Sequence, residues 1–384
     1  MSPRLRGPLA WLGAAWLVLS ACGARTDILG TDGESVADAG RRSVTAPDDA
    51  SFPPGDAPSP PRDAPSPLND APSPPGDASP GCGARGQACC VDGACAGALS
   101  CVGGTCTTTA GGTLVLFGGE NASGASLNDT WVFDGTTWTE LAIPGSPPAR
   151  SYATMATLGN EVVLFGGEDS EVLEDTWVFD GTSWREVSAS NGPADSSGAM
   201  ATLGSEIVLY GGQGPDDTWV FDGTRWSLLA TPVAPSVRLG ASAATLGSEV
   251  ILFGGADTND TWAFEGTRWS RVHVTTRPPG REDNSLATLG GEVVLFGGSS
   301  ALGENLNDTW TFDGARWARV AVASPPPARQ DAAMATLGGR VVLFGGGNHG
   351  PLDDTWTFDG TTWSQVTVES PPPARFGATM AALP

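Results

Sequence analysis

The sequence predicts an all-β protein in which six copies of one unit close into a ring of four-stranded sheets. Three observations carry this prediction. From Thr113 onward the chain repeats every 43 to 48 residues, a period typical of solenoids and propellers. Each copy holds short apolar runs of strand length, separated by glycine-rich turns. The first copy lacks one strand, and the chain ends with a surplus copy of that strand.

Each unit is predicted to form four strands, here named a to d in chain order. In the second copy, strand a ("ATMATL") and strand b ("VVLF") are joined through Gly-Asn into a hairpin. The glycines after strand b permit unusual backbone angles. In the first copy, strand c ("TWVF") and strand d ("TTWTEL") are joined through Asp-Gly, which is a strong hairpin signal.

A glycine doublet followed by two tryptophans, with six residues between them, recurs in all six copies. The doublets begin at Gly118, Gly166, Gly211, Gly254, Gly297 and Gly345. The tryptophan pairs are Trp131 and Trp138, Trp177 and Trp184, Trp219 and Trp226, Trp262 and Trp269, Trp310 and Trp317, and Trp356 and Trp363. This pattern resembles the kelch motif over residues 113–383. The resemblance implies a β-propeller with one four-stranded blade per repeat, and we assign it residues 107–384.

The C-terminal strand is expected to close the ring. The stretch "TAGGTLVLFGG" enters the first copy directly at strand b, whereas residues 375–384 supply an extra strand a. If that strand completes the first blade, the ring closes at six blades and leaves no edge strand exposed.

The twelve tryptophans are expected to be structural because they occupy the same two positions in every blade. Platforms for sugar rings would vary between copies and lie in loops, whereas repeated large aromatic side chains are typical of a packed core. The aspartate of each Asp-Thr-Trp is expected to form hydrogen bonds in a turn at the start of strand c.

Residues 1–21 have the form of an export signal. Two arginines precede an apolar run of about a dozen residues, which is too short to span a bilayer. The end of this run, Leu19-Ser20-Ala21-Cys22, resembles the lipobox of bacterial lipoproteins. The resemblance implies acylation of Cys22 and a lipid anchor, and Gly23 in place of a retention aspartate favours the outer membrane. An ordinary cleaved signal is the alternative.

Two further segments precede the repeats. Residues 22–81 are rich in Pro, Asp, Ser and Ala, and we expect them to form a disordered stalk. Residues 82–106 contain six cysteines: Cys82, Cys89, Cys90, Cys95, Cys101 and Cys106. In an exported chain they predict a small module with three disulfides, similar to cystine-knot modules, whose connectivity stays open. A metal cluster is the rival interpretation.

The net charge of −23 argues against nucleic acid and against an anionic membrane surface as partners. Contact with a membrane is therefore expected through the lipid anchor only, and the protein is expected to be a monomer.

The loops between strands b and c and between strands d and a share one face of the predicted ring. The b–c loops contain 9, 7, 4, 4, 9 and 7 residues, and irregular loops on a rigid scaffold are a common place for recognition. One position in the loop before each strand a recurs in all six repeats, and we call these six residues the arginine column: Arg150, Asp195, Arg238, Arg281, Arg329 and Arg375. Either these arginines ring the channel mouth and bind a carboxylate or sulfate, or they pair with acids of a neighbouring blade. Further candidate ligand-binding residues are Tyr152, Glu282, Asp283, Gln330, Phe376 and His349.

Most enzyme classes are not supported by the residues present. The copper-radical oxidases share the propeller fold but need tyrosine, cysteine and histidine ligands. Here the repeats hold two tyrosines, two separated histidines and no cysteine, so we predict no catalytic residue, metal or cofactor. We expect a lipid-anchored binding protein, periplasmic or surface-facing, with a protein or glycan ligand on the b–c/d–a loop face. The alternative is a sugar mutarotase or epimerase of the sialic-acid type, acting at the channel mouth.

Overall fold

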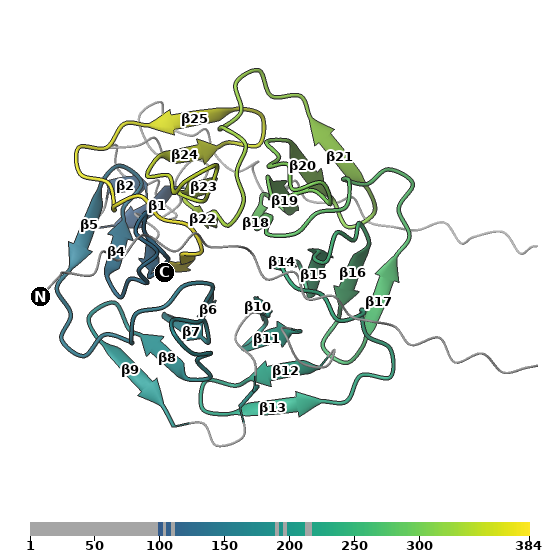
Figure 1. Cartoon of the computed structure of the whole chain (residues 1–384), viewed down its shortest axis with the longest axis horizontal. Coiled ribbons are helices and arrows are strands. Elements are labelled where there is room, and N and C mark those ends of the chain that lie inside the picture. The colour runs from purple at the N-terminus through teal and green to yellow at the C-terminus, as the bar shows by residue number, and fades with distance from the viewer. Residues whose placement is uncertain (1–98, 103–104, 109–111, 189–191, 195–197, 212–216) are drawn as a thin grey trace, which may run out of the picture. The chain divides into compact units, whose positions relative to one another are not determined.

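The computed structural model describes residues 99–102, 105–108, 112–188, 192–194, 198–211 and 217–384. These residues form 26 strands and no helix, so no described element has the form of a membrane-spanning helix. β1 (Leu99–Val102) and β2 (Thr105–Thr108) form a two-stranded antiparallel hairpin. The remaining strands form six four-stranded antiparallel sheets arranged around one centre (Figure 1). The predicted six-bladed propeller is confirmed.

The strands fall into four concentric positions. The innermost strands are β26 (Thr379–Leu383), β6 (Thr154–Leu158), β10 (Ala199–Leu203), β14 (Ala241–Leu246), β18 (Ser285–Leu289) and β22 (Ala333–Leu337). The second position holds β3 (Thr113–Phe117), β7 (Glu161–Phe165), β11 (Glu206–Tyr210), β15 (Glu249–Gly254), β19 (Glu292–Phe296) and β23 (Arg340–Phe344). The third holds β4 (Thr130–Phe133), β8 (Thr176–Phe179), β12 (Thr218–Phe221), β16 (Thr261–Phe264), β20 (Thr309–Phe312) and β24 (Thr355–Phe358). The outermost are β5 (Trp138–Leu141), β9 (Trp184–Val187), β13 (Trp226–Leu229), β17 (Trp269–Val272), β21 (Trp317–Val320) and β25 (Trp363–Val366).

The C-terminal strand completes the first blade. β26 pairs with β3 in an antiparallel register that runs from Thr379 opposite Phe117 to Leu383 opposite Thr113. The order of this sheet is β26-β3-β4-β5, whereas the other five blades are built from four consecutive strands. The predicted closure is confirmed, and it joins the two ends of the repeat region in one sheet.

The second tryptophan of each repeat holds neighbouring blades together. Each of these side chains is buried, and each indole N–H donates to the threonine hydroxyl at the start of strand c in the adjacent blade. The bond from Trp138 to Thr355 measures 3.0 Å and joins the first blade to the sixth. Trp184 also packs against Phe117 of the first blade, with ring centroids 5.2 Å apart. These contacts confirm the structural role expected for the second tryptophan of each repeat. The first tryptophan is buried at Trp131 and Trp310 and half-buried in the other four repeats.

Threonine side chains tie the innermost strands together at the end of the channel next to the a–b turns. Each hydroxyl donates to a backbone carbonyl of the neighbouring innermost strand. The donor and acceptor residues are Thr157 and Ala382, Thr202 and Thr157, Thr245 and Thr202, Thr288 and Thr245, and Thr336 and Thr288. These bonds fix the spacing of the strands that form the channel wall.

Several expectations concern residues outside the described ranges. The signal, the stalk and Cys22, Cys82, Cys89, Cys90 and Cys95 all lie there. Cys101 and Cys106 lie opposite each other in the register of the β1–β2 hairpin.

Candidate functional site

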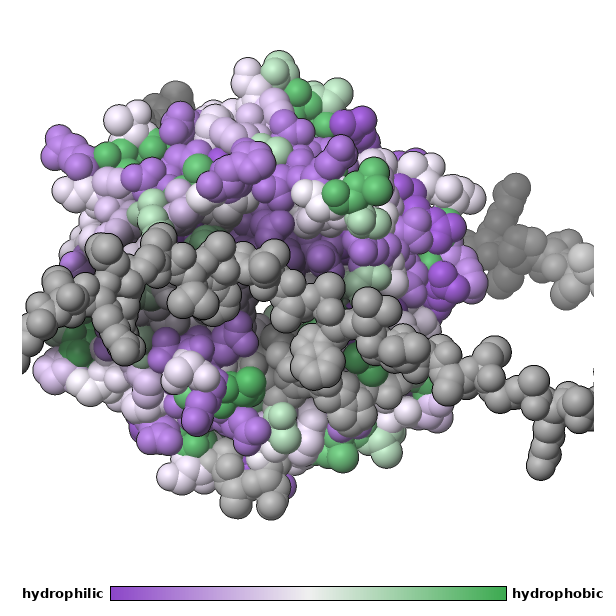
Figure 2. Space-filling model, in the orientation of Figure 1, coloured by the Kyte–Doolittle hydropathy of each residue, from purple (hydrophilic) through white to green (hydrophobic). Residues whose placement is uncertain are grey.

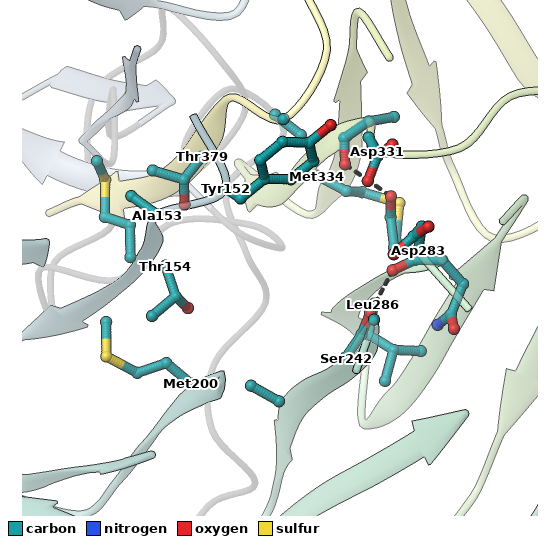
Figure 3. Close-up of a pocket in the computed structure, with 18 of the residues that line it drawn as sticks. Tyr152, Ala153, Thr154, Met200, Ser242, Asp283, Leu286, Asp331, Met334 and Thr379 are labelled. Carbon is teal, nitrogen blue, oxygen red and sulfur yellow. Dashed lines mark hydrogen bonds between the residues drawn. The ribbon is translucent and has the colours of Figure 1, made fainter. Parts of the chain in front are cut away.

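A cavity of about 460 Å³ lies in the centre of the ring, within the six innermost strands (Figure 3). Polar and apolar groups contribute about equally to its wall, and the apolar part comes from Leu286, several alanines and every methionine after Met1. These methionines are Met155, Met200, Met334 and Met380. Ionisable groups line the mouth that belongs to the b–c/d–a loop face: Tyr152, Asp283 and Asp331 just before innermost strands, and Glu168 in the b–c loop after β7. No arginine or histidine is among the described lining residues.

A belt of backbone hydrogen bonds runs around this mouth. It uses the position two residues after the arginine column, where the amide N–H donates to the carbonyl of the same position in the neighbouring blade. The bonds run from Tyr152 to Gly377 (2.8 Å), from Gly377 to Asp331 (3.0 Å), from Asp331 to Asp283 (3.0 Å) and from Asp283 to Gly240 (2.8 Å). All five residues have a positive φ, between 54° and 67°.

Three of these belt positions hold residues other than glycine. Tyr152, Asp283 and Asp331 adopt φ values of 58°, 55° and 54°, a left-handed conformation that costs about 1 kcal/mol or more for residues with a Cβ. Gly240 and Gly377 adopt the same conformation without that cost. The belt therefore imposes the backbone geometry and places an aromatic side chain and two carboxylates at the mouth.

The neighbouring glycines make room for these side chains. A Cβ on Gly377 would lie 3.1 Å from the ring of Tyr152, and a Cβ on Gly240 would lie 2.4 Å from a carboxylate oxygen of Asp283. The Tyr152 ring therefore lies over Gly377, and Asp283 lies over Gly240. Figure 3 shows the Tyr152 side chain extending toward Asp331 across the mouth.

The mouth is electrostatically negative. Burial, together with the nearby Asp283 carboxylate, raises the pKa of Asp331 to about 7, although the Gln330 amide donates to Asp331 Oδ2 at 3.0 Å. Burial and Asp257 raise the pKa of Asp283, and burial, Asp283 and Asp257 raise that of Glu282. No described cation balances these groups within the lining, and each acid makes its neighbours harder to ionise.

Acids around the mouth also act on Tyr152. Burial is the largest cause that raises the pKa of its phenol, followed by the charges of Asp331, Glu120, Asp283 and Glu168. The phenol is therefore neutral across the physiological pH range.

The arginine column does not face the cavity. The five arginines in the described ranges are 0 to 3% exposed. Four of them form short bidentate pairs with the Asp-Thr-Trp aspartate, as Arg150 does with Asp175 at 2.5 and 2.9 Å; Arg238 binds Asp260 at 2.6 and 3.3 Å. The other pairs are Arg281 with Asp308, Arg329 with Asp354, and Arg375 with Asp129.

Each pair lies within one blade, not between neighbouring blades. Arg150 precedes β6 and its partner Asp175 precedes β8, both in the second blade. The same guanidinium donates to the carbonyls of Gly166 and Pro148. The column therefore ties the loop before strand a to the loop before strand c.

The aspartates that pair with these arginines were expected to form hydrogen bonds within a turn, but their observed partners are the arginine and a tryptophan. Asp175 accepts the indole N–H of Trp177 at 2.7 Å while it binds Arg150. Burial alone would raise the pKa of Asp175, but the hydrogen bonds from Arg150 and Trp177 outweigh it and lower the pKa. One carboxylate therefore connects a buried cation with the first tryptophan of its repeat.

The remaining sequence candidates separate into two groups. Glu282, Gln330 and Phe376 form isolated backbone bridges with the b–c loops, at Ser299, Gly347 and Glu120 respectively. His349 is exposed in a loop and is not part of the described cavity lining. Asp195 lies outside the described residues. Of the candidates that the structure describes, Tyr152 and Asp283 line the cavity and the others do not.

Sequence reasoning missed Asp331 and the methionine wall. The signal for Asp331 was its spacing: it lies two residues after Arg329, as Tyr152 follows Arg150 and Asp283 follows Arg281. The described residues contain no group of three His, Cys, Asp or Glu side chains placed to hold a metal ion. The mouth can therefore offer carboxylate acceptors, a neutral phenol and an apolar wall to a ligand.

Comparison with known proteins agrees with this architecture. A family model described as the KLHDC2/KLHL20/DRC7 Kelch-repeats domain matches residues 95–255 and 199–384. A curated relative, acyl-CoA-binding domain-containing protein 6 from Oryza sativa subsp. japonica, is 41% identical to the chain over 68 residues. This match spans 17% of the chain and 10% of that relative. The family model covers well over half of the chain, which therefore belongs to the kelch-repeat family.

Proposed function

We propose that the protein is an exported binding protein that presents the b–c/d–a loop face of its propeller to a protein or glycan ligand. Kelch propellers are scaffolds for protein interactions. In this proposal Cys22 carries a lipid anchor in the bacterial outer membrane, and the propeller acts as a monomer in the periplasm or at the cell surface. The stalk keeps it clear of the lipid headgroups.

The distribution of exposed apolar side chains carries the proposal. Six large hydrophobic residues are exposed in the described chain, and five of them lie in b–c or d–a loops: Val172, Val233, Val237, Leu239 and Leu302. Leu302 is 84% exposed. The a–b and c–d turns hold none of these residues. Exposed apolar residues concentrated on one face favour an interaction surface there.

The repeated frame of the propeller supports the same interpretation. The face shown in Figure 2 is largely hydrophilic, with apolar residues in small separate groups. Beneath the loops, five of the six blades carry the same buried Arg–Asp pair among the described residues, and all six carry the same tryptophan–threonine bond, so the frame varies little. The loops that differ from blade to blade are therefore the part of the molecule suited to choose a ligand.

The observed geometry does not support the enzyme alternative, because the arginines that would bind its substrate are not free. A mutarotase or epimerase for a carboxylated sugar would need free arginines at the mouth, but the five described arginines of the column are buried in ion pairs. The mouth is also acidic, which disfavours a carboxylated substrate.

A matched pair of variants tests the proposal. The double variant Val237→Ser with Leu302→Ser removes apolar surface from the loop face. Leu228→Ser removes an exposed leucine (55%) from the outermost strand β13, away from the loop face. With the full chain as bait on a glycan array and against extracellular proteins, binding should fall in the loop-face variant and persist in Leu228→Ser. Equal binding by both variants would reject the loop face as the binding surface.

A further inference from the structure

We infer that the central cavity holds the neutral terminal sugar of a glycan ligand, which forms hydrogen bonds with the hydroxyls of Thr154, Thr379 and Tyr152. This inference rests on the proposed function, because it chooses between the protein and glycan ligands named there and states the charge of the sugar. It places recognition inside the channel, while the loop face contacts the rest of the glycan.

Two threonine hydroxyls open into the cavity without a hydrogen-bond partner. Thr379 begins β26 and is only 9% exposed, and the half-buried Thr154 begins the neighbouring strand β6. Neither side chain forms a hydrogen bond among the described residues. In that part of the chain only the Asn284 amide is both unpaired and sealed from solvent, so the two hydroxyls are open to the cavity that they line (Figure 3). Because buried polar side chains are normally satisfied, Thr379 indicates a place where a ligand completes the hydrogen bonding.

The same strand position carries a hydroxyl with a structural role in two other blades. Ser242 of β14 and Ser285 of β18 each donate to a backbone carbonyl just before the next innermost strand. These bonds join neighbouring blades. Thr154 and Thr379 stand at the equivalent position of β6 and β26 and make no such bond. The frame therefore does not use their hydroxyls, which remain available to a ligand.

The other polar groups complete a circle around the cavity. The Tyr152 phenol also has no hydrogen-bond partner in the described chain, and it lies at the mouth between the two threonines and the carboxylates of Asp283 and Asp331 (Figure 3). A hydroxyl donates and accepts, whereas a carboxylate only accepts. An ammonium group only donates, so it would leave the protons of the three hydroxyls without acceptors. A sugar carries hydroxyls around its whole ring and matches both kinds of group, whereas a peptide backbone carries its polar groups along one line.

The charges of the wall select a neutral sugar. The acidic lining residues are Glu168, Asp283 and Asp331, and no described lining residue is basic. A sugar with a carboxylate would bring its charge next to these acids without a cation to balance it. The apolar half of the wall and the ring of Tyr152 instead offer contacts to the C–H groups of an uncharged sugar ring.

The size of the cavity and its rim fit one sugar at the end of a longer chain. A volume of about 460 Å³ lies within the range of small-molecule sites, about 300–1,000 Å³. Around the mouth, four b–c loops fold back through a backbone bridge, at Glu120–Ser126, Glu168–Val172, Ser299–Asn305 and Gly347–Pro351.

The b–c loop of the fourth blade, residues 256–259, is shorter and forms no such bridge among the described residues. Its Ala256 amide donates to the Leu239 carbonyl at 2.9 Å. Leu239 lines the cavity and is 47% exposed, and Val237 in the same loop is 49% exposed. The glycan would therefore leave the mouth beside these two side chains, which connects the cavity with the apolar residues of the loop face.

The test uses the full chain and the neutral methyl glycosides of glucose, galactose, mannose, fucose and N-acetylglucosamine. Saturation-transfer NMR detects binding, calorimetry measures affinity, and at least one glycoside should bind. Thr379→Val removes the hydroxyl and keeps the branched shape. It should weaken that glycoside about threefold to tenfold, the range for one neutral hydrogen bond, without lowering the melting temperature. Thr154→Val and Tyr152→Phe repeat the measurement at the other two hydroxyls.

Thr157→Val is the matched control. It lies on the same strand as Thr154, but its hydroxyl is bonded to the Ala382 carbonyl at the other end of the channel. This replacement should lower the melting temperature and leave sugar binding unchanged. A second probe tests charge: the uronic acid that corresponds to the bound glycoside should bind at least about tenfold more weakly, because its carboxylate meets Asp283 and Asp331.

Three results would overturn the inference. They are no binding of any neutral glycoside at tens of millimolar, binding of the uronic acid as tight as that of the neutral sugar, and effects of Thr379→Val and Thr154→Val no larger than that of Thr157→Val. If no sugar binds but Val237→Ser with Leu302→Ser abolishes binding of a protein ligand, the loop face is still a binding surface and only the sugar is wrong. If that double variant leaves all binding unchanged, the proposed function itself fails.

Discussion

Replacing Arg329 by alanine is expected to destabilise the propeller strongly, although this residue lies in a loop. Its guanidinium binds Asp354 at 2.6 and 2.8 Å and donates to the carbonyls of Gly345 at 2.8 Å and Pro327 at 3.0 Å. After the replacement, the Asp354 carboxylate keeps the Trp356 indole N–H at 2.7 Å but has no cation. Removing one member of a buried pair costs about 3–5 kcal/mol.

Some contact between Asp354 and water reduces this cost. The Asp354 side chain is 17% exposed, so we expect a loss of about 2–4 kcal/mol, or a drop in melting temperature of roughly 5–15 °C for a domain of this size. Adding Asp354→Ala should recover part of the loss, because it removes the unpaired carboxylate. Thermal unfolding followed by circular dichroism measures both variants.

Arg316→Ala is the matched control. Its side chain is 78% exposed and lies 3.1 Å from Asp313, so its removal should change stability by less than about 0.5 kcal/mol. If Arg329→Ala melts at the same temperature as Arg316→Ala, the structural role of the column is wrong. A stable Arg329→Ala protein that loses an acidic ligand would instead make the column a binding site.

Three further predictions concern the closing strand β26, the proposed lipid anchor at Cys22 and Asp331 at the channel mouth. Deleting residues 375–384 removes β26 and the Arg375–Asp129 pair and should cost at least about 5 kcal/mol; an unchanged urea midpoint would contradict closure by this strand. Cys22→Ser should move the protein from the membrane pellet to the soluble fraction, and unaltered sedimentation would reject the lipid anchor. Asp331 has a pKa raised from 3.8 to about 7, so the folded state holds a proton that the unfolded state releases, and stability falls as pH rises through this window. At pH 8 the Asp331→Asn variant should therefore be more stable than the parent protein by about 1–2 kcal/mol, a figure reduced for partial exposure, and near pH 4 the two should be equally stable. Urea midpoints that do not differ between variant and parent at either pH would contradict the raised pKa.

The fold could be predicted from the sequence because each blade repeats the same local signals. Strand-length apolar runs, glycine doublets and Asp-Gly hairpins specify four strands without reference to distant parts of the chain. Closure could also be predicted, because the first repeat has no strand a of its own before residues 113–117 and residues 379–383 supply one. The buried tryptophans followed from their identical positions in every copy.

The sequence could not show whether the side chains of the arginine column face the channel or the interior of the blade. Arg150 and Asp175 are 25 residues apart, and Arg375 and Asp129 are 246 apart, so no local pattern shows that they meet. An arginine before an inner strand is equally compatible with a channel and with a pair inside the blade. Only the path of the loops decides between these arrangements, and that path turns the guanidiniums toward the Asp-Thr-Trp aspartates.

The belt shows why the mouth carries the opposite charge from the one that a ring of free arginines would give it. Repetition identifies what the frame needs, and the frame uses its arginines to satisfy its own buried aspartates. The belt position two residues later holds tyrosine, glycine or aspartate, because the backbone bonds accept any side chain that tolerates a positive φ. Because the repeated contacts do not fix the side chain at this position, comparison of the repeats does not single it out. For the same reason its side chain is available for a ligand. In Asp283 and Asp331 this freedom has placed two carboxylates at the channel mouth, where the belt fixes their backbone and leaves their side chains outside the repeated frame.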